Sequence, residues 1–79
     1  MKISVTADHI ARGTRTACMH CPVALAYGEQ TGHLCSVTVL PATIKDLVTH
    51  RIYPLPAWVG ALIEDHDLGG TMEPFSFEI

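Results

Sequence analysis

Residues 18–27 read CMHCPVALAY, and this stretch decides how the middle of the chain folds. Pro22 favours the first position of a helix, because the N–H group that proline lacks would have no partner there. Cys21 then stands at the capping position, and the helix runs through Tyr27 until the segment Gly28–Gly32 ends it. The stretch therefore predicts a helix that begins at Pro22.

Alternation of apolar and polar residues predicts strands around this helix. The expected strands are residues 2–6, 33–40, 42–46, 49–53 and 75–79. The third and fourth form a hairpin with residues 45–48 around its turn, although residues 46–49 could also form a helical turn. In the strand at 33–40 the alternation places Cys35 on the buried side.

Two more helices are predicted, one near each end of the chain. Thr6 caps a short helix that stops at Gly13. A longer helix spans Pro56–Asp67 and ends at Gly69–Gly70. Its apolar residues recur in one stripe that includes Trp58, which predicts a core position for that side chain, with an interface anchor as the alternative.

These elements predict a single α+β domain over residues 1–79, with a small antiparallel sheet of about four to five strands packed against one or two helices. A chain of 79 residues hides only part of its surface on folding, so its stability is modest. The strand at 75–79 is expected to close the sheet, and removal of the last five residues is expected to unfold the domain.

Size and composition narrow the function classes. The sequence has no run of about 18 apolar residues and no segment typical of a signal peptide. We therefore expect a soluble cytoplasmic protein without a membrane partner. The three cysteines fit reduced thiols better than a disulfide framework. The chain also lacks a nucleophile elbow and a phosphate-binding loop. We therefore expect a protein that is not an enzyme and that binds no cofactor.

Charge is divided unevenly along the chain. Residues 1–55 hold five basic and three acidic residues (+2), residues 56–79 hold five acidic residues and no lysine or arginine (−5), and the two sum to −3. Direct DNA binding needs several cations on one face, so this division favours a protein that presents acid to a basic partner. The candidate binding residues are Glu64, Asp65, Asp67 and Glu73, with Arg12 and Arg15 as the alternative.

The cysteines leave three interpretations open. Cys18, Cys21, His33 and Cys35 could form a zinc site, although the second pair lacks the spacing of most zinc knuckles. Cys18 and Cys21 could form a redox pair at the start of a helix. In the third interpretation Cys21 is a capping or core group, Cys18 packs beside it, His20 is exposed and no metal binds.

Three segments carry a resemblance to known proteins: MKISVTADHIARG (1–13), CMHCPVALA (18–26) and EPFSFEI (73–79). They resemble a group of very small proteins encoded by bacteriophages, prophages and their bacterial hosts, and the likeness is weaker over residues 41–51. The sequence is also similar to anti-CRISPR inhibitors of type I systems, subtype I-C being one candidate. This resemblance assigns no individual site residue.

The resemblance implies a stoichiometric inhibitor in the cytoplasm of a bacterial host. Such a protein, as a monomer or weak homodimer, would bind the type I surveillance complex, Cascade, and block its binding to target DNA. Together with the charge division, this implies that the acidic residues compete with DNA for a basic surface. The alternative function is a small zinc- or thiol-stabilised phage or bacterial domain with another partner.

Overall fold

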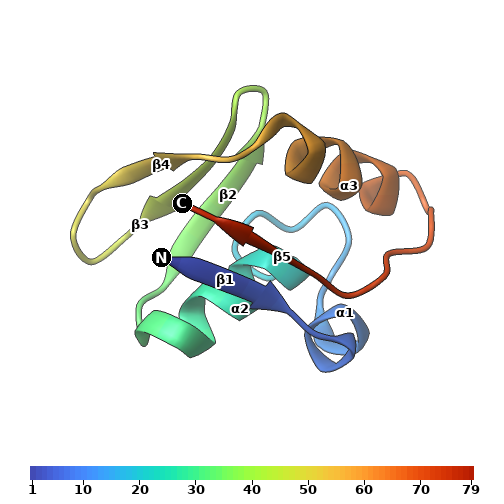
Figure 1. Cartoon of the computed structure of the whole chain (residues 1–79), viewed down its shortest axis with the longest axis horizontal. Helices are drawn as coiled ribbons and strands as arrows, with labels where there is room; N and C mark the ends of the chain where they lie inside the picture. The colour runs from blue at the N-terminus through green and yellow to red at the C-terminus, as the bar shows by residue number, and fades with distance from the viewer.

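A computed structural model describes all 79 residues of the chain. It has five strands and three helices (Figure 1). In chain order these are β1 (Lys2–Val5), α1 (Ala7–Arg12), α2 (Pro22–Thr31), β2 (Cys35–Val39), β3 (Ala42–Asp46), β4 (Ile52–Pro54), α3 (Ala57–Asp67) and β5 (Phe75–Glu78). The expected α+β class is confirmed.

The strands divide between two antiparallel sheets, where the sequence predicted one sheet. Strands β2, β3 and β4 follow one another as a three-stranded meander, in which the predicted hairpin is confirmed. Strand β5 pairs with β1, and Ile3 stands opposite Phe77. The terminal amine donates to the carbonyl of Ile79 at 2.9 Å, so the two ends of the chain lie side by side.

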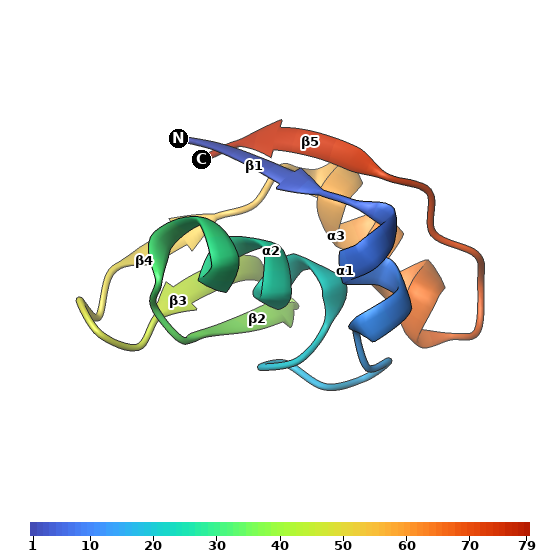
Figure 2. The ribbon, with the colours of Figure 1, turned by 90° about the horizontal axis from the view of Figure 1, so that it is seen from below.

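Helix α2 lies between the two sheets and contacts β1 on one side and β2 on the other (Figure 2). Its start agrees with the sequence: Pro22 is the first residue, and Cys21 Sγ accepts from the N–H of Ala24 at 3.5 Å. The helix continues through Gly28 and ends at Gly32, which adopts the left-handed conformation that favours glycine (φ 76°).

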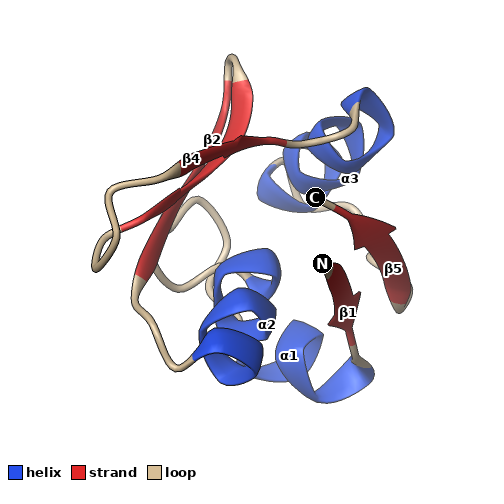
Figure 3. Cartoon of the chain, turned by 60° about the vertical axis from the view of Figure 1, so that its left-hand side comes forward, coloured by secondary structure: helices blue, strands red, loops and turns tan.

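The core fills the space around α2. Cys35 is only 3% exposed, as the strand alternation predicted. The other core side chains come from every element except α1 and β4 and include Ile3, Val23, Tyr27, Ile44, Val59 and Phe77. Figure 3 shows the two sheets apart from each other, with α2 in the space between them. No helix has both the length and the apolar content needed to span a membrane.

The core position predicted for Trp58 is wrong, because its side chain is 50% exposed. The buried face of α3 is formed by Val59, Ile63 and His66 together with Gly60. A β-carbon at position 60 would lie 2.9 Å from the β-carbon of Ala42, so glycine allows the helix to approach β3 closely. Trp58 stays on the outside of α3, where its ring contacts Phe75 edge-on with 5.7 Å between centroids.

Candidate functional site

The four acidic residues predicted as a binding site lie in α3 and in the segment that leads from it to β5. None of them forms an ion pair, whereas each of the other four acidic residues contacts Arg12, a histidine or the terminal amine. We call Glu64, Asp65, Asp67 and Glu73 the acidic end of the molecule. Arg15 lies at the same end of the molecule, but it donates to backbone carbonyls and forms no ion pair with these four carboxylates.

The four residues of the acidic end differ in their surroundings. Glu64, Asp65 and Glu73 are exposed. Asp67 is half-buried, and its Oδ1 accepts from the backbone N–H of Thr16 at 2.8 Å. Thr16 has a positive φ of 60°, which is costly for a β-branched residue, so Asp67 stabilises the loop before α2.

The exposed side of α3 gathers residues from successive turns: Ala57, Trp58, Ala61, Glu64 and Asp65. We call these five residues the display face. Trp58 and Asp65 are seven residues apart, which is two turns and about 10 Å along the axis of a helix. The display face therefore combines a large aromatic ring with two carboxylates.

The two arginines of the alternative site are both bound within the chain. Arg12 contacts Asp8 at 2.8 Å and Glu29 at 3.3 Å. The hydrogen bond to Asp8, followed by the charge of that carboxylate, raises the pKa of Arg12. Arg15 donates to the carbonyls of His66 and Gly70, the second at 2.9 Å, and so holds the loop before α2 against the end of α3.

The remaining basic residues lie away from the acidic end. Lys2 begins β1, Lys45 lies in β3 and Arg51 directly precedes β4, and none of the three forms an ion pair. Figure 1 shows the β3–β4 loop and the last turn of α3 at opposite ends of the molecule. These three basic residues are therefore separated from the acidic end, whereas Arg15 lies beside it and Glu78 lies beside the terminal amine.

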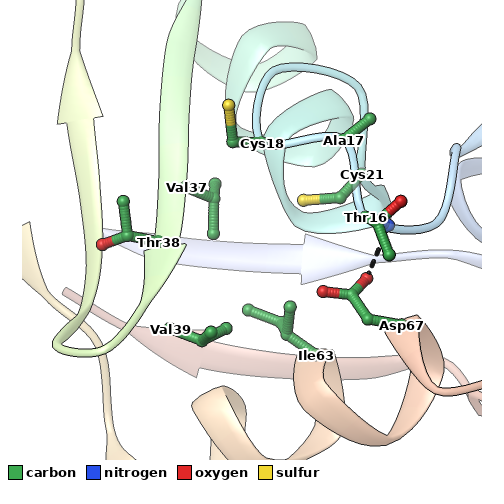
Figure 4. A pocket seen from close by; sticks show the side chains of 9 residues that line it. All are labelled: Thr16, Ala17, Cys18, Cys21, Val37, Thr38, Val39, Ile63 and Asp67. Atoms are coloured by element: carbon green, nitrogen blue, oxygen red, sulfur yellow. Dashed lines mark hydrogen bonds between the residues drawn. The ribbon is translucent and has the colours of Figure 1, made fainter.

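Cys18 and Cys21 both line a small pocket of about 130 Å³ (Figure 4). Val37, Ile63 and Asp67 form other walls of this pocket. Cys18 is exposed, whereas Cys21 is buried. Burial raises the pKa of the Cys21 thiol despite hydrogen bonds from the N–H groups of Ala24 and Val23, and a raised pKa favours an unreactive thiol.

The zinc site written from Cys18, Cys21, His33 and Cys35 is not assembled. No group of three or more His, Cys, Asp or Glu side chains is placed to hold a metal ion. The physical reason is that these side chains are used elsewhere: Cys35 Sγ donates to the carbonyl of Ala24 at 3.6 Å, and His33 Nδ1 contacts Asp46 at 2.8 Å. Burial raises the pKa of Cys35 to about 12, so its thiolate, the form that binds metal, is disfavoured.

A buried carboxylate that the sequence interpretation missed stands at the end of β3. Asp46 is 2% exposed, and its Oδ2 accepts from the hydroxyl of Tyr27 at 2.6 Å and contacts His33. Its Oδ1 accepts from the N–H groups of Val48 and Thr49. Burial alone would raise the pKa of Asp46, but the hydrogen bonds from Tyr27, Thr49, His33 and Val48 outweigh it and lower that pKa. An aspartate at the start of a turn is the local signal that indicates this role.

A second missed residue is His9, which is 3% exposed. Its Nδ1 accepts from the N–H of Thr6 at 3.0 Å, and the Thr6 hydroxyl caps the N–H of His9 in return. The other ring nitrogen, Nε2, lies 3.0 Å from a carboxylate oxygen of Glu29 and therefore donates to it. The three-residue spacing of Thr6 and His9 is the capping-box signal, with histidine in the place of glutamate. These contacts join α1 to α2.

Comparison of the chain with protein-family models, curated proteins and solved structures gives no match. The resemblance to phage and anti-CRISPR proteins therefore depends on the sequence segments alone. Those segments form β1, α1, the beginning of α2 and β5, and all of these except α1 contribute side chains to the core. All five residues of the display face lie outside the segments. The segments carry information about the scaffold more than about a binding surface.

Proposed function

We propose that this protein is a non-enzymatic inhibitor that binds the type I CRISPR surveillance complex through the acidic end and the display face of α3. In this proposal it occupies a basic surface that otherwise contacts target DNA. The observation that carries the proposal is the gathering of all four unpaired acidic side chains at one end of the molecule. Subtype I-C is the first system to test.

Electrostatics favour this type of partner. A complex that holds guide RNA and target DNA displays lysines and arginines along its nucleic-acid channel. Unpaired carboxylates meeting such a surface increase the association rate and disfavour acidic partners. The ion pairs made by Asp8, Glu29 and Glu78 leave those carboxylates less available for the same purpose.

Trp58 supplies the apolar part of the proposed interface. Half-exposed tryptophans near charged residues are frequent anchors of protein–protein interfaces. The edge-on contact with Phe75 limits the movement of the ring on one side, which reduces the side-chain entropy lost when a partner covers it. We expect Trp58→Ala to weaken binding about 30-fold, which corresponds to about 2 kcal/mol of an interface hot spot.

The decisive experiment compares two charge-reversal double variants. Glu64→Lys/Asp65→Lys changes the display face, and Asp8→Lys/Glu78→Lys changes the net charge equally at exposed carboxylates elsewhere. Purified variants are titrated into a type I-C surveillance complex, and its binding to labelled target DNA is measured by gel shift. Circular dichroism checks that both variants are folded.

The display-face variant is expected to lose inhibition at least tenfold, and the control variant to retain it. Equal losses would mean that net charge alone matters, and unchanged inhibition by the display-face variant would exclude this face. Association of the wild-type protein with the complex, measured by size-exclusion chromatography, is also expected to weaken at high salt. Failure to associate with any type I complex would overturn the proposed function.

A further inference from the structure

A shallow groove of about 440 Å³ runs between α3 and the β2–β3 hairpin. Its walls include Pro41 of the hairpin turn and Pro54 at the end of β4. The helix contributes Ala57, Gly60, Ala61 and Glu64, four residues spaced along one side of α3. The groove is therefore continuous with the display face.

Small side chains keep this groove open. Gly60 brings α3 against Ala42, since any β-carbon at position 60 would lie too close to that residue. Ala57 and Ala61 are exposed and carry only a methyl group, so no side chain of the helix fills the space beside them. The prolines opposite present rigid apolar surface without a backbone N–H group.

Glu64 is the only charged residue that lines the groove. Its side chain is exposed and forms neither an ion pair nor a hydrogen bond within the chain. An apolar channel with one unpaired carboxylate is complementary to a side chain that is apolar along its stem and positive at its tip. Lysine and arginine side chains have this character.

We infer that the groove binds one arginine or lysine side chain of the protein partner, with its methylene groups along Pro41, Pro54 and Ala61 and its charged head at Glu64. This inference rests on the proposed function and adds a specific pocket to it. Arginine fits better than lysine, because its planar guanidinium can donate two parallel hydrogen bonds to one carboxylate. Asp65 and Glu73, which do not line the groove, contribute only screened long-range attraction.

A peptide titration tests the groove without the surveillance complex. The probes are N-acetyl-Leu-Arg-Leu-amide and the matched N-acetyl-Leu-Gln-Leu-amide, followed by amide chemical shifts of the labelled protein. The arginine peptide is expected to shift residues 57–64 and to bind about threefold more tightly than the glutamine peptide, as an exposed ion pair allows. Glu64→Gln is expected to abolish that preference, whereas Asp65→Asn is expected to retain it.

A pair of variants tests the groove within the full complex. Ala61→Arg places a cation three residues before Glu64 and covers the groove, while Ala11→Arg adds the same charge at an exposed alanine of α1. Ala61→Arg is expected to weaken association with the surveillance complex at least fivefold. Ala11→Arg is expected to change it less than twofold.

The outcomes separate the groove from the proposed function. If Ala61→Arg and Ala11→Arg behave alike and the arginine peptide shifts the whole acidic end, the groove inference is wrong and the proposed function stands. If shifts at residues 57–64 instead follow protein concentration, the groove binds a second copy of this chain, which also overturns the inference. Peptide binding at the groove without any association of the surveillance complex would retain the groove and overturn the proposed function.

Discussion

Helices α2 and α3 have nearly the same length, 10 and 11 residues, but they relate to the rest of the molecule in different ways. Helix α2 contacts both sheets and buries five of its residues. Helix α3 buries one side and leaves the display face open. One helix holds the fold together, while the other carries most of the unpaired acidic residues.

The two helices also differ in whether their charged residues form ion pairs. Glu29 is the only charged residue of α2, and it is paired with both His9 and Arg12. Helix α3 holds three acidic residues without a basic partner. The two helices therefore differ in whether their carboxylates have an ionic partner within the chain, and this difference is the basis of the proposed binding surface on α3.

Two aromatic residues provide the largest expected contrast. Phe77 is 4% exposed and lies opposite Ile3 in the β1–β5 sheet, so Phe77→Ala is expected to lower the free energy of unfolding by about 3–5 kcal/mol. Trp58→Ala, at a half-exposed position, is expected to cost about 1 kcal/mol or less. Urea denaturation followed by circular dichroism measures both.

The milder variant Ile3→Val keeps this test usable if Phe77→Ala does not fold. Its expected cost is about 0.5–1.5 kcal/mol. If Trp58→Ala lowered the free energy of unfolding more than Phe77→Ala, the distinction between a scaffold around α2 and a display face on α3 would fail.

Local sequence signals predicted much of the fold. Pro22 and Cys21 marked the start of α2, and alternation identified Cys35 as buried. The division into two sheets could not be predicted, because alternation identifies strands but not their partners, and Lys2 pairs with Glu78 across nearly the whole chain. Trp58 was misplaced because the close contact of Gly60 with Ala42, which turns the helix, has no signal in the stripe of apolar residues.

The candidate site was predictable to a similar degree. The acidic residues were visible as a charge asymmetry in the sequence. Which of them are unpaired was not visible, because the decisive contacts join distant residues. Arg12 meets Glu29 across 17 positions, and Thr16 meets Asp67 across 51.

The next largest effect is expected at the hydroxyl of Tyr27. Tyr27→Phe removes a buried hydrogen bond to the charged Asp46 and is expected to cost about 1–3 kcal/mol. Tyr53→Phe is a matched control, because Tyr53 is half-buried and its hydroxyl forms no hydrogen bond within the chain. Equal costs for the two variants in urea denaturation would show that the Asp46 contact adds no stability.

The pH dependence of stability is expected to come from the same region. Because its hydrogen bonds lower the pKa of Asp46 on folding, the stability they contribute is complete above the unfolded value of about 4 and is lost as pH falls below it. Asp46→Asn is expected to flatten this acid limb. Urea denaturation midpoints between pH 2 and pH 7 measure this loss of stability in acid. If the variant loses as much stability in acid as the wild type, another group is responsible for the loss.

Above about pH 9 the stability of the fold is expected to change in the opposite direction, falling as the pH rises. Burial raises the pKa of Cys35 from 9.0 in the unfolded chain to about 12, so the folded chain holds a proton that the unfolded chain has released. Stability is therefore expected to fall as pH rises from about 9 toward 12, by up to about 1.4 kcal/mol per pH unit for one thiol. Cys35→Ala is expected to reduce this slope, whereas Cys18→Ala, which removes the exposed thiol, is expected to keep the wild-type slope. An equal reduction in both variants would contradict the assignment.

The smallest expected effect on stability belongs to the display face itself. Glu64→Lys/Asp65→Lys breaks no ion pair and removes two negative charges from the last turns of α3, where the helix dipole favours cations. The free energy of unfolding is therefore expected to stay within about 0.5 kcal/mol of the wild type or to rise slightly. A variant that is as stable as the wild type but no longer binds its partner would show that these carboxylates serve recognition at a small cost to the fold. A clear loss of stability in urea would instead mean that α3, like α2, depends on its charges for folding, and the contrast between the two helices would fail.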